Sequence, residues 1–162
     1  TTLQTIRPYL PQDREAVLAL LLSPAPWNTL GYSRSQWEAY FAPFPEGREG
    51  FVIEIDGQVA GLAVLRPRFL FGDYLELFGI AERLRGQGLG STLLRWVEQR
   101  VFQRGHNLFI CVSDFNDGGR RFYARHGYTV VGPLSDLLVQ GRAELLLRKT
   151  FGPAQRSGER TS

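Results

Sequence analysis

Apolar and polar residues alternate in several short runs, the period that a half-buried strand requires. The clearest case spans 51–66, where two alternating runs flank Asp56-Gly57, a dipeptide that favours a two-residue hairpin turn. Residues 108–113 are continuously apolar instead, which predicts a buried strand. Outside the hairpin, the predicted strands cover 3–8, 71–81, 108–113, 128–132 and 143–149.

Apolar residues three and four positions apart predict helices between these strands. In the longest helix, Leu89, Leu93, Val97 and Val101 recur every four residues and define one apolar face. Ser33 is the expected N-cap of a shorter one, because its hydroxyl can accept a bond from the first turn. The predicted helices cover 11–22, 33–41, 88–104 and 117–126.

The resulting element order is β-α-α-β-β-β-α-β-α-β-β. Because it mixes hairpins with helical crossovers, we expect an α/β (α+β) fold with a mixed sheet flanked by helices. Neither a repeat nor a linker divides the apolar runs, so a single domain is expected over residues 1–150. Residues 151–162 are almost without apolar side chains and are expected to form a disordered tail.

Composition places the chain among ordinary globular domains, with 162 residues, 43% hydrophobic and 22% charged. No apolar run approaches the roughly 20 residues of a membrane span, and the first residues lack a signal-peptide pattern. A cytoplasmic location is therefore expected. Cys111 is the only cysteine and only two histidines accompany it, so neither an internal disulfide nor a metal site is expected.

Charge leaves two classes of ligand open. The formal net charge is +3, spread along the chain, which suits an anionic small molecule as well as nucleic acid. Lys149 is the only lysine, so every other basic side chain apart from the two histidines is an arginine.

A glycine-rich run, RLRGQGLG at 83–90, joins a predicted strand to the longest predicted helix. It lacks the lysine of a P-loop, and Ser91 stands where a dinucleotide-binding loop has its third glycine. Helix N-termini present unpaired N–H groups and partial positive charge, and Arg85 adds a full charge beside them. The run therefore predicts a pyrophosphate-binding loop, with a plain strand-to-helix turn as the alternative.

This run also carries a family resemblance. A strand, then Arg85-Gly86-Gln87-Gly88-Leu89-Gly90, then a helix resembles the GNAT superfamily of N-acetyltransferases. A second signature follows at the expected separation in FNDGGRRFYARHGY, with Asn116, Tyr123 and the pair Gly127-Tyr128. The resemblance covers nearly the whole chain, from about residue 3 to 150.

The resemblance implies a sheet of about six to seven strands splayed into a V, about four flanking helices, and coenzyme A in the cleft. It implies an N-acetyltransferase that uses acetyl-CoA and acts on a primary amine of a small molecule or of a protein N-terminus or lysine. The cofactor-binding residues carried over from the family motifs are Gly79, Ile80, Arg85, Gly86, Gln87, Gly88, Leu89, Gly90, Ser91, Asn116 and Tyr123.

Two segments depart from the family pattern. Glu82 stands where many members have a proline before the arginine. The helix after Asn116 begins with Gly118 and Gly119, and glycine costs about 1 kcal/mol against alanine inside a helix. We therefore expect the first turn of this helix to be loosely formed.

Acetyl transfer needs a base for the amine and an acid for the leaving thiolate. Tyr123 is the candidate acid, with a core tyrosine as the alternative. Glu76 is the candidate base, because it is a lone carboxylate amid apolar residues and burial would raise its pKa. The alternative places it on a solvent-facing strand surface. Asp73, Asp136 and Glu144 are weaker candidates.

In the family, the acceptor site is built from the early helices, the strand before the glycine run and the last two strands. Trp37 and Phe69 also lie in these segments. All the aromatic residues there suit core packing equally well, and core packing is the expected role of Trp37. The acceptor-site candidates there are Trp27, Tyr32, Phe71, Asp73, Tyr74 and Asp136.

Two other functions compete with catalysis. A non-catalytic module that binds acyl-CoA would share the same loop. A nucleic-acid binder would explain the arginines, but no recognition motif supports it. We therefore expect no nucleic-acid or membrane partner, and a monomer or homodimer, as the resemblance allows.

Overall fold

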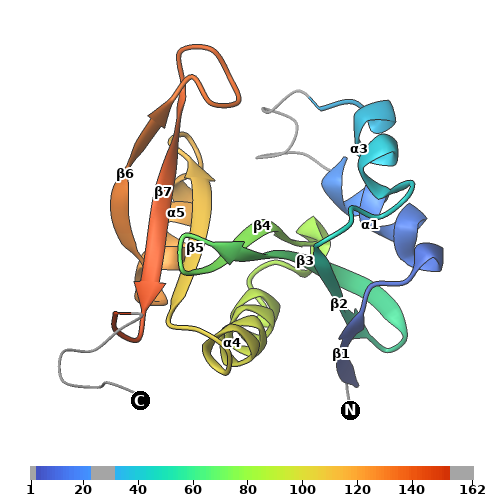
Figure 1. Cartoon of the computed structure of the whole chain (residues 1–162). Helices are drawn as coiled ribbons and strands as arrows, with labels where there is room; N and C mark the ends of the chain where they lie inside the picture. Colours follow the sequence, from blue (N-terminus) through green and yellow to red (C-terminus); the bar gives the residue numbers. More distant parts are fainter. Residues whose placement is uncertain (1–2, 23–31, 154–162) are drawn as a thin grey trace. The chain divides into compact units, whose positions relative to one another are not determined.

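The computed structural model describes residues 3–22 and 32–153 (Figure 1). Within these residues seven strands follow the sheet order β1-β2-β3-β4-β5-β7-β6, and four helices accompany them. For the described residues, the predicted order of strands and helices is confirmed. The strands are β1 (Gln4–Pro8), β2 (Glu49–Ile55), β3 (Gln58–Phe69), β4 (Gly72–Ile80), β5 (Asn107–Ser113), β6 (Thr129–Ser135) and β7 (Ala143–Thr150).

The helices also lie where the sequence predicts them. Ser33 caps its helix as expected, because its hydroxyl accepts a bond from the Gln36 N–H at 3.2 Å. The helices are α1 (Arg14–Leu21), α3 (Arg34–Phe41), α4 (Leu89–Phe102) and α5 (Asp117–Arg125), with 3-10 turns η1 (Pro11–Asp13) and η2 (Glu82–Leu84).

The chain forms two compact units. The first comprises the described residues up to Pro67 together with Leu75–Trp96, and the second comprises Arg68–Tyr74 and the described residues from Val97 onward. The predicted tail falls mostly on residues 154–162, which lie outside the described residues.

In the first unit, β1, β2 and β3 pair in antiparallel order. The hairpin turn lies at Asp56 and Gly57, both with positive φ, 50° and 82°. This geometry matches the right-handed twist of the flanking strands and explains why this dipeptide is found there. The predicted hairpin is therefore confirmed, and β2 and β3 extend slightly beyond its predicted ends.

Helices α1 and α3 bury one face of these strands. Trp37 belongs to this core, which confirms the packing role expected for it. On the other face, the ring of Phe51 contacts Trp96 of α4 at a centroid distance of 4.7 Å. The buried members of the α1–α3 core are Val17, Leu18, Leu20, Leu21, Trp37, Phe41, Val52, Leu62, Val64 and Leu77.

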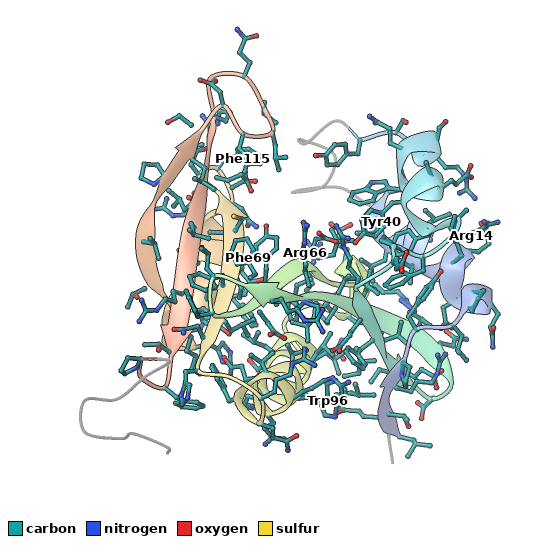
Figure 2. The ribbon with its side chains drawn as sticks, in the orientation of Figure 1. Arg14, Tyr40, Arg66, Phe69, Trp96 and Phe115 are labelled. Carbon is teal, nitrogen blue, oxygen red and sulfur yellow. The ribbon has the colours of Figure 1, made fainter. Side chains whose placement is uncertain are left out.

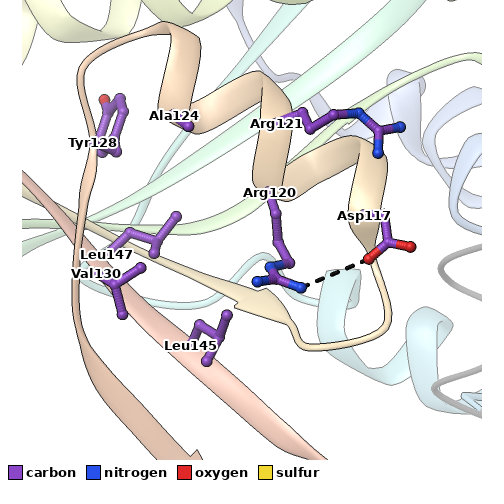
Figure 3. A pocket seen from close by; sticks show the side chains of 8 residues that line it. All are labelled: Asp117, Arg120, Arg121, Ala124, Tyr128, Val130, Leu145 and Leu147. Carbon is purple, nitrogen blue, oxygen red and sulfur yellow. Dashed lines mark ion pairs between the residues drawn. The ribbon is translucent and has the colours of Figure 1, made fainter.

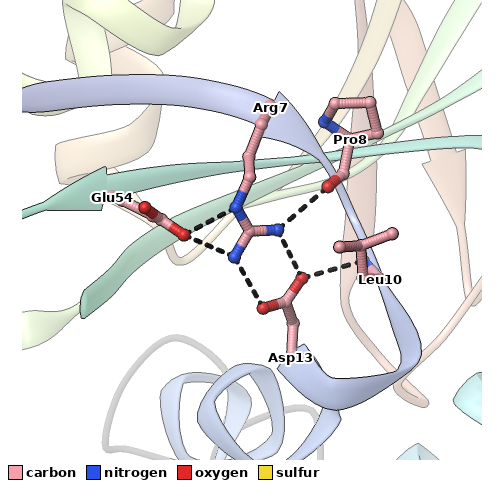
Figure 4. Close-up of polar contacts among 5 residues, drawn as sticks. All are labelled: Arg7, Pro8, Leu10, Asp13 and Glu54. Atoms are coloured by element: carbon pink, nitrogen blue, oxygen red, sulfur yellow. Dashed lines mark hydrogen bonds and ion pairs between the residues drawn. The ribbon is translucent and has the colours of Figure 1, made fainter. Parts of the chain in front are cut away.

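An ion-pair network connects β1 and η1 to β2 (Figure 4). The Arg7 guanidinium donates to both carboxylate oxygens of Asp13 at 2.8 Å, and its Nε donates to Glu54 at 2.6 Å. Asp13 also accepts from the Leu10 N–H at 2.8 Å and is only 5% exposed. These donors hold the pKa of the Asp13 carboxyl below its ordinary value.

The second unit contains the antiparallel strands β5, β7 and β6. Strand β5 is almost entirely buried, which confirms the interpretation of its continuous apolar run. Beside it, the Tyr128 hydroxyl and the Lys149 ammonium both donate to the buried Glu98 carboxylate, at 2.7 and 3.0 Å.

Helix α4 has the predicted apolar face. Leu89, Leu93, Val97 and Val101 are all buried, at 3% exposure or less. None of the described helices combines the length and the apolar character that crossing a membrane requires.

Candidate functional site

The glycine-rich loop lies between η2 and α4 and has the backbone that only glycine adopts readily. Gly86 and Gly88 both have φ of 80°, a region that other residues enter at a cost. A Cβ placed on either glycine would meet no atom within 4 Å. Space over the loop is therefore open, and the glycines serve the backbone conformation.

The loop presents a row of unsatisfied donors. In the part of the chain that the structure describes, the backbone N–H groups of Gly86 to Gly90 have no acceptor. Helical bonding resumes at Thr92, whose N–H and hydroxyl both donate to the Gly88 carbonyl at 3.0 Å. Successive free amides at the N-terminus of a 14-residue helix form an anion site. This arrangement fits the pyrophosphate of coenzyme A.

The other cofactor-binding candidates of the first unit lie next to this loop. Arg85 is exposed, and its Nε donates a long bond of 3.4 Å to the carbonyl of Ile80. Gly79 and Ile80 end β4, where β3 approaches so closely that a Cβ on Gly61 would lie 2.9 Å from the Gly79 carbonyl. Ser91 lies in the first turn of α4.

Asn116 forms the N-cap of α5. Its Oδ1 accepts from the Gly119 N–H at 2.9 Å, and its Nδ2 has no acceptor within the described residues. The expectation of a loose first turn is wrong, because this cap holds it. A Cβ on Gly119 would lie 2.5 Å from Nδ2, so the glycine makes room for the cap. Asn116 therefore keeps an amide donor for a ligand.

Tyr123 lies on the buried face of α5. Its side chain is only 7% exposed, and its ring contacts the Tyr128 ring edge-on at 5.6 Å. Burial raises the pKa of the Tyr123 phenol well above its ordinary value. The phenol is therefore protonated at neutral pH, which is the state that a general acid requires.

Glu76 is neither isolated nor fully open to solvent. Its side chain is 17% exposed, its Oε2 accepts a short hydrogen bond from the Tyr40 hydroxyl, and Arg48 Nε lies 3.3 Å from the same oxygen. The other oxygen, Oε1, makes one long contact, 3.4 Å to Arg48 Nη2. Oε1 is therefore the atom of Glu76 with capacity to accept a proton or a further donor.

Tyr40 and Arg48 are functional candidates that the sequence did not reveal. Burial, followed by the bond to Glu76, raises the pKa of the Tyr40 phenol above its ordinary value. Tyr40 therefore acts as a neutral donor to the carboxylate. Figure 2 shows Tyr40 on α3, above the sheet of the first unit.

The acceptor-site candidates have diverse surroundings. Asp73 is buried and paired with the Arg104 guanidinium, whose Nε lies 3.1 Å from it. Phe71 is 84% exposed in the β3–β4 turn with φ of 59°. Asp136 lies in the exposed β6–β7 loop and accepts from the Gly141 N–H at 2.6 Å.

The remaining candidates are aromatic. Tyr32 packs edge-on against Trp37 at 5.1 Å, which places it at the rim of the α1–α3 core. Tyr74 lies against Phe69 at 5.0 Å and hydrogen-bonds the half-buried thiol of Cys111. Trp27 lies outside the described residues.

A groove of about 410 Å³ runs between α5 and strands β6 and β7 of the second unit (Figure 3). Arg120 and Arg121 line its helical side, and Asp117 lies 3.7 Å from the Arg120 guanidinium. Leu145 and Leu147 of β7 contribute to its apolar side. Both arginines are exposed, as a solvated helix face predicts.

Comparison with known proteins agrees with this geometry. Residues 14–128 match the Acetyltransferase (GNAT) family. The sequence is 28% identical to an uncharacterized N-acetyltransferase of Bacillus subtilis, YesJ, over 77% of this chain and 81% of that protein.

Solved structures share the fold. An aminoglycoside 6'-N-acetyltransferase complexed with coenzyme A superposes with a TM-score of 0.76 at 18% identity, over 94% of this chain and 99% of that chain. The Escherichia coli ribosomal-protein-S18-alanine N-acetyltransferase superposes with a TM-score of 0.76 at 17% identity, over 99% of both chains.

Proposed function

Since the chain belongs to the GNAT family of acetyltransferases, which use acetyl-CoA, we propose that it transfers an acetyl group from acetyl-CoA to a primary amine of a small molecule or protein. Acetyl-CoA, when bound, supplies the acetyl thioester that the amine attacks directly. The observation that carries the proposal is the row of unpartnered amides from Gly86 to Gly90.

The glycine loop and Asn116 are proposed to hold the cofactor. The free amides at the N-terminus of α4 would bind the pyrophosphate, and Arg85 would add a positive charge beside it. The unused Nδ2 donor of Asn116 would bind a carbonyl of the pantetheine arm. Backbone groups of Gly79 and Ile80 would pair with the same arm.

Glu76 and Tyr123 are proposed to move the protons. Oε1 of Glu76 would take the proton of the acceptor amine, directly or through water, while Tyr40 and Arg48 hold the carboxylate in place. The Tyr123 phenol, kept protonated by burial, would give its proton to the departing sulfur.

Calorimetric titration with acetyl-CoA tests the loop, with dephospho-CoA and ATP as comparisons. We expect micromolar binding of acetyl-CoA that is lost in Arg85→Glu and Gly88→Asp. A well-folded protein that does not bind acetyl-CoA would contradict the proposal.

Thiol release with a panel of amines tests catalysis. Replacing Tyr123 with Phe should lower kcat by about 10²-fold or more, with acetyl-CoA affinity nearly unchanged. If the variant turns over at the original rate, Tyr123 is not the acid. Tight binding without thiol release from any amine would leave a module that binds acyl-CoA without catalysis.

A further inference from the structure

The charges around Glu76 are predominantly positive. Arg48 contacts the Glu76 carboxylate with two nitrogen atoms, at 3.3 and 3.4 Å. Arg66 projects from β3 on the side of the sheet where Tyr40 lies (Figure 2). Among the described residues, the cluster of Tyr40, Arg48, Arg66 and Glu76 therefore contains two guanidinium groups and one carboxylate, which gives it a net positive charge.

Leu62 and Val64, which alternate with Arg66 along β3, belong to the α1–α3 core, so Arg66 lies on the face of the sheet that faces Tyr40. Burial and the bond to Glu76 raise the pKa of the Tyr40 phenol, and the positive charges of Arg48 and Arg66 oppose that rise. The Arg66 side chain is exposed, and no carboxylate among the residues described pairs with it. Its guanidinium fork is thus available to a ligand.

This charge balance disfavours acceptors that carry several amino groups. A polyamine would bring further positive charge toward Arg48 and Arg66, and like charges close together repel. Glu76, the one carboxylate that the described residues contribute to the cluster, already accepts from Tyr40 and Arg48 on Oε2. A carboxylate on the acceptor would instead find the fork of Arg66, whose planar donors match it bidentately.

Resting on the proposed acetyl transfer, we propose that the acceptor is a small amine of the α-amino-acid class and that Arg66 binds its carboxylate. The amino group of such a molecule would face Oε1 of Glu76. Arg66 is then a specificity-determining residue, because removing its guanidinium weakens the binding of the acceptor and leaves the proton transfers intact.

The test compares matched acceptors at saturating acetyl-CoA by thiol release. Each set contains an α-amino acid, its α-amide, its decarboxylated amine and its aminophosphonic acid, all with the same side chain. We expect the kcat/KM of the amino acid to exceed that of the amide and the amine by about tenfold or more. Equal or better turnover of the amide, the amine, a polyamine or a peptide N-terminus would overturn the proposal. Preference for the aminophosphonic acid would overturn the choice of carboxylate.

Variants at Arg66 supply the second measurement. Arg66→Gln should raise the KM for the amino acid about 10- to 100-fold, with kcat nearly unchanged, because a charge-assisted bond is lost. Arg66→Lys should be intermediate, since it keeps the charge and loses the fork. Arg95→Gln, an exposed arginine on α4, is the control and should change neither constant. An unchanged KM in Arg66→Gln would overturn the assignment.

Failure of this inference and failure of the proposed function give different results. Acetyl transfer to amides or polyamines, with acetyl-CoA bound, refutes only the amino-acid class. Acetyl-CoA binding without transfer to any amine refutes the proposed function and this inference together. Acetyl-CoA affinity of Arg66→Gln, measured by calorimetry, should equal that of the unaltered protein and thereby reports its folding.

Discussion

The Tyr40 hydroxyl on α3 donates a hydrogen bond to the Glu76 carboxylate on β4, 36 residues further along the chain. The bond occupies Oε2, the oxygen that Arg48 Nε also contacts, and thereby sets the orientation of Oε1. A side chain of α3 thus holds the carboxylate that is proposed to act as the base.

Replacing Tyr40 with Phe should therefore lower kcat without weakening cofactor binding. We expect a loss of about 10-fold, corresponding to one hydrogen bond to a charged group. Steady-state kinetics and calorimetry with acetyl-CoA measure the two effects. Tyr9→Phe, a tyrosine packed against the same core and without a proposed role in the site, is the control. A Tyr40→Phe enzyme with unaltered kcat would show that Glu76 needs no such support.

Replacing Gly88 with Ala should weaken acetyl-CoA binding about tenfold or more. An alanine at φ of 80° is strained by about 1–2 kcal/mol, and relief of the strain would turn the loop amides away from the ligand. Gly57→Ala is the matched control, since Gly57 has φ of 82° and also has no neighbour within 4 Å. Both variants should lose similar stability in urea unfolding, and only the first should lose affinity.

Two neighbouring glycines of α5 should respond in opposite directions. Gly119→Ala brings a Cβ to 2.5 Å from the Asn116 side chain, so the cap must move, and stability should fall by about 1 kcal/mol. Gly118→Ala meets no atom within 4 Å and should stabilise the helix by up to about 1 kcal/mol. Thermal unfolding of the two variants measures the difference. Equal effects would contradict the role of the cap.

The Arg7–Asp13 pair predicts a stability that depends on pH. Because the Arg7 and Leu10 donors lower the pKa of folded Asp13 from 3.8, its contribution is present above pH 3.8 and is lost as pH falls through the lower, folded value. Asp13→Asn should cost about 1–3 kcal/mol at pH 6, and this cost should shrink as the pH falls below 3.8.

Urea unfolding at several pH values measures this dependence. Glu15→Gln serves as the control. Glu15 pairs with Arg34 at the exposed surface, so this ion pair should contribute little to the free energy of unfolding. A cost of Asp13→Asn that stays constant from pH 6 to pH 2.5 would refute the assignment.

Elements with a strong local pattern could be predicted from the sequence. The apolar face of α4 and the Asp56-Gly57 turn follow from spacing and from backbone preference alone. Both were therefore located to within a few residues. The glycine loop could be predicted as well, because its arginine and glycines follow one another directly in the sequence.

Contacts between distant segments could not be predicted. Glu76 could be singled out as a carboxylate among apolar residues, but its partners Tyr40 and Arg48 depend on how α3 and the residue before β2 pack against β4. The prediction for the first turn of α5 was wrong for another reason. Glycine propensity predicts a loose turn, and a single side chain, Asn116, overrides it by capping.

The second unit holds the only lysine of the sequence, and its position has a practical consequence. The ammonium group of Lys149 is tied to the buried Glu98 and lies 5.7 Å from the centre of the Tyr128 ring. Enzymes of this family acetylate amines, and the one lysine of this sequence is held in an ion pair, so we expect little self-acetylation of its side chain. Anti-acetyl-lysine antibodies should therefore report on added protein acceptors with little background from the enzyme itself.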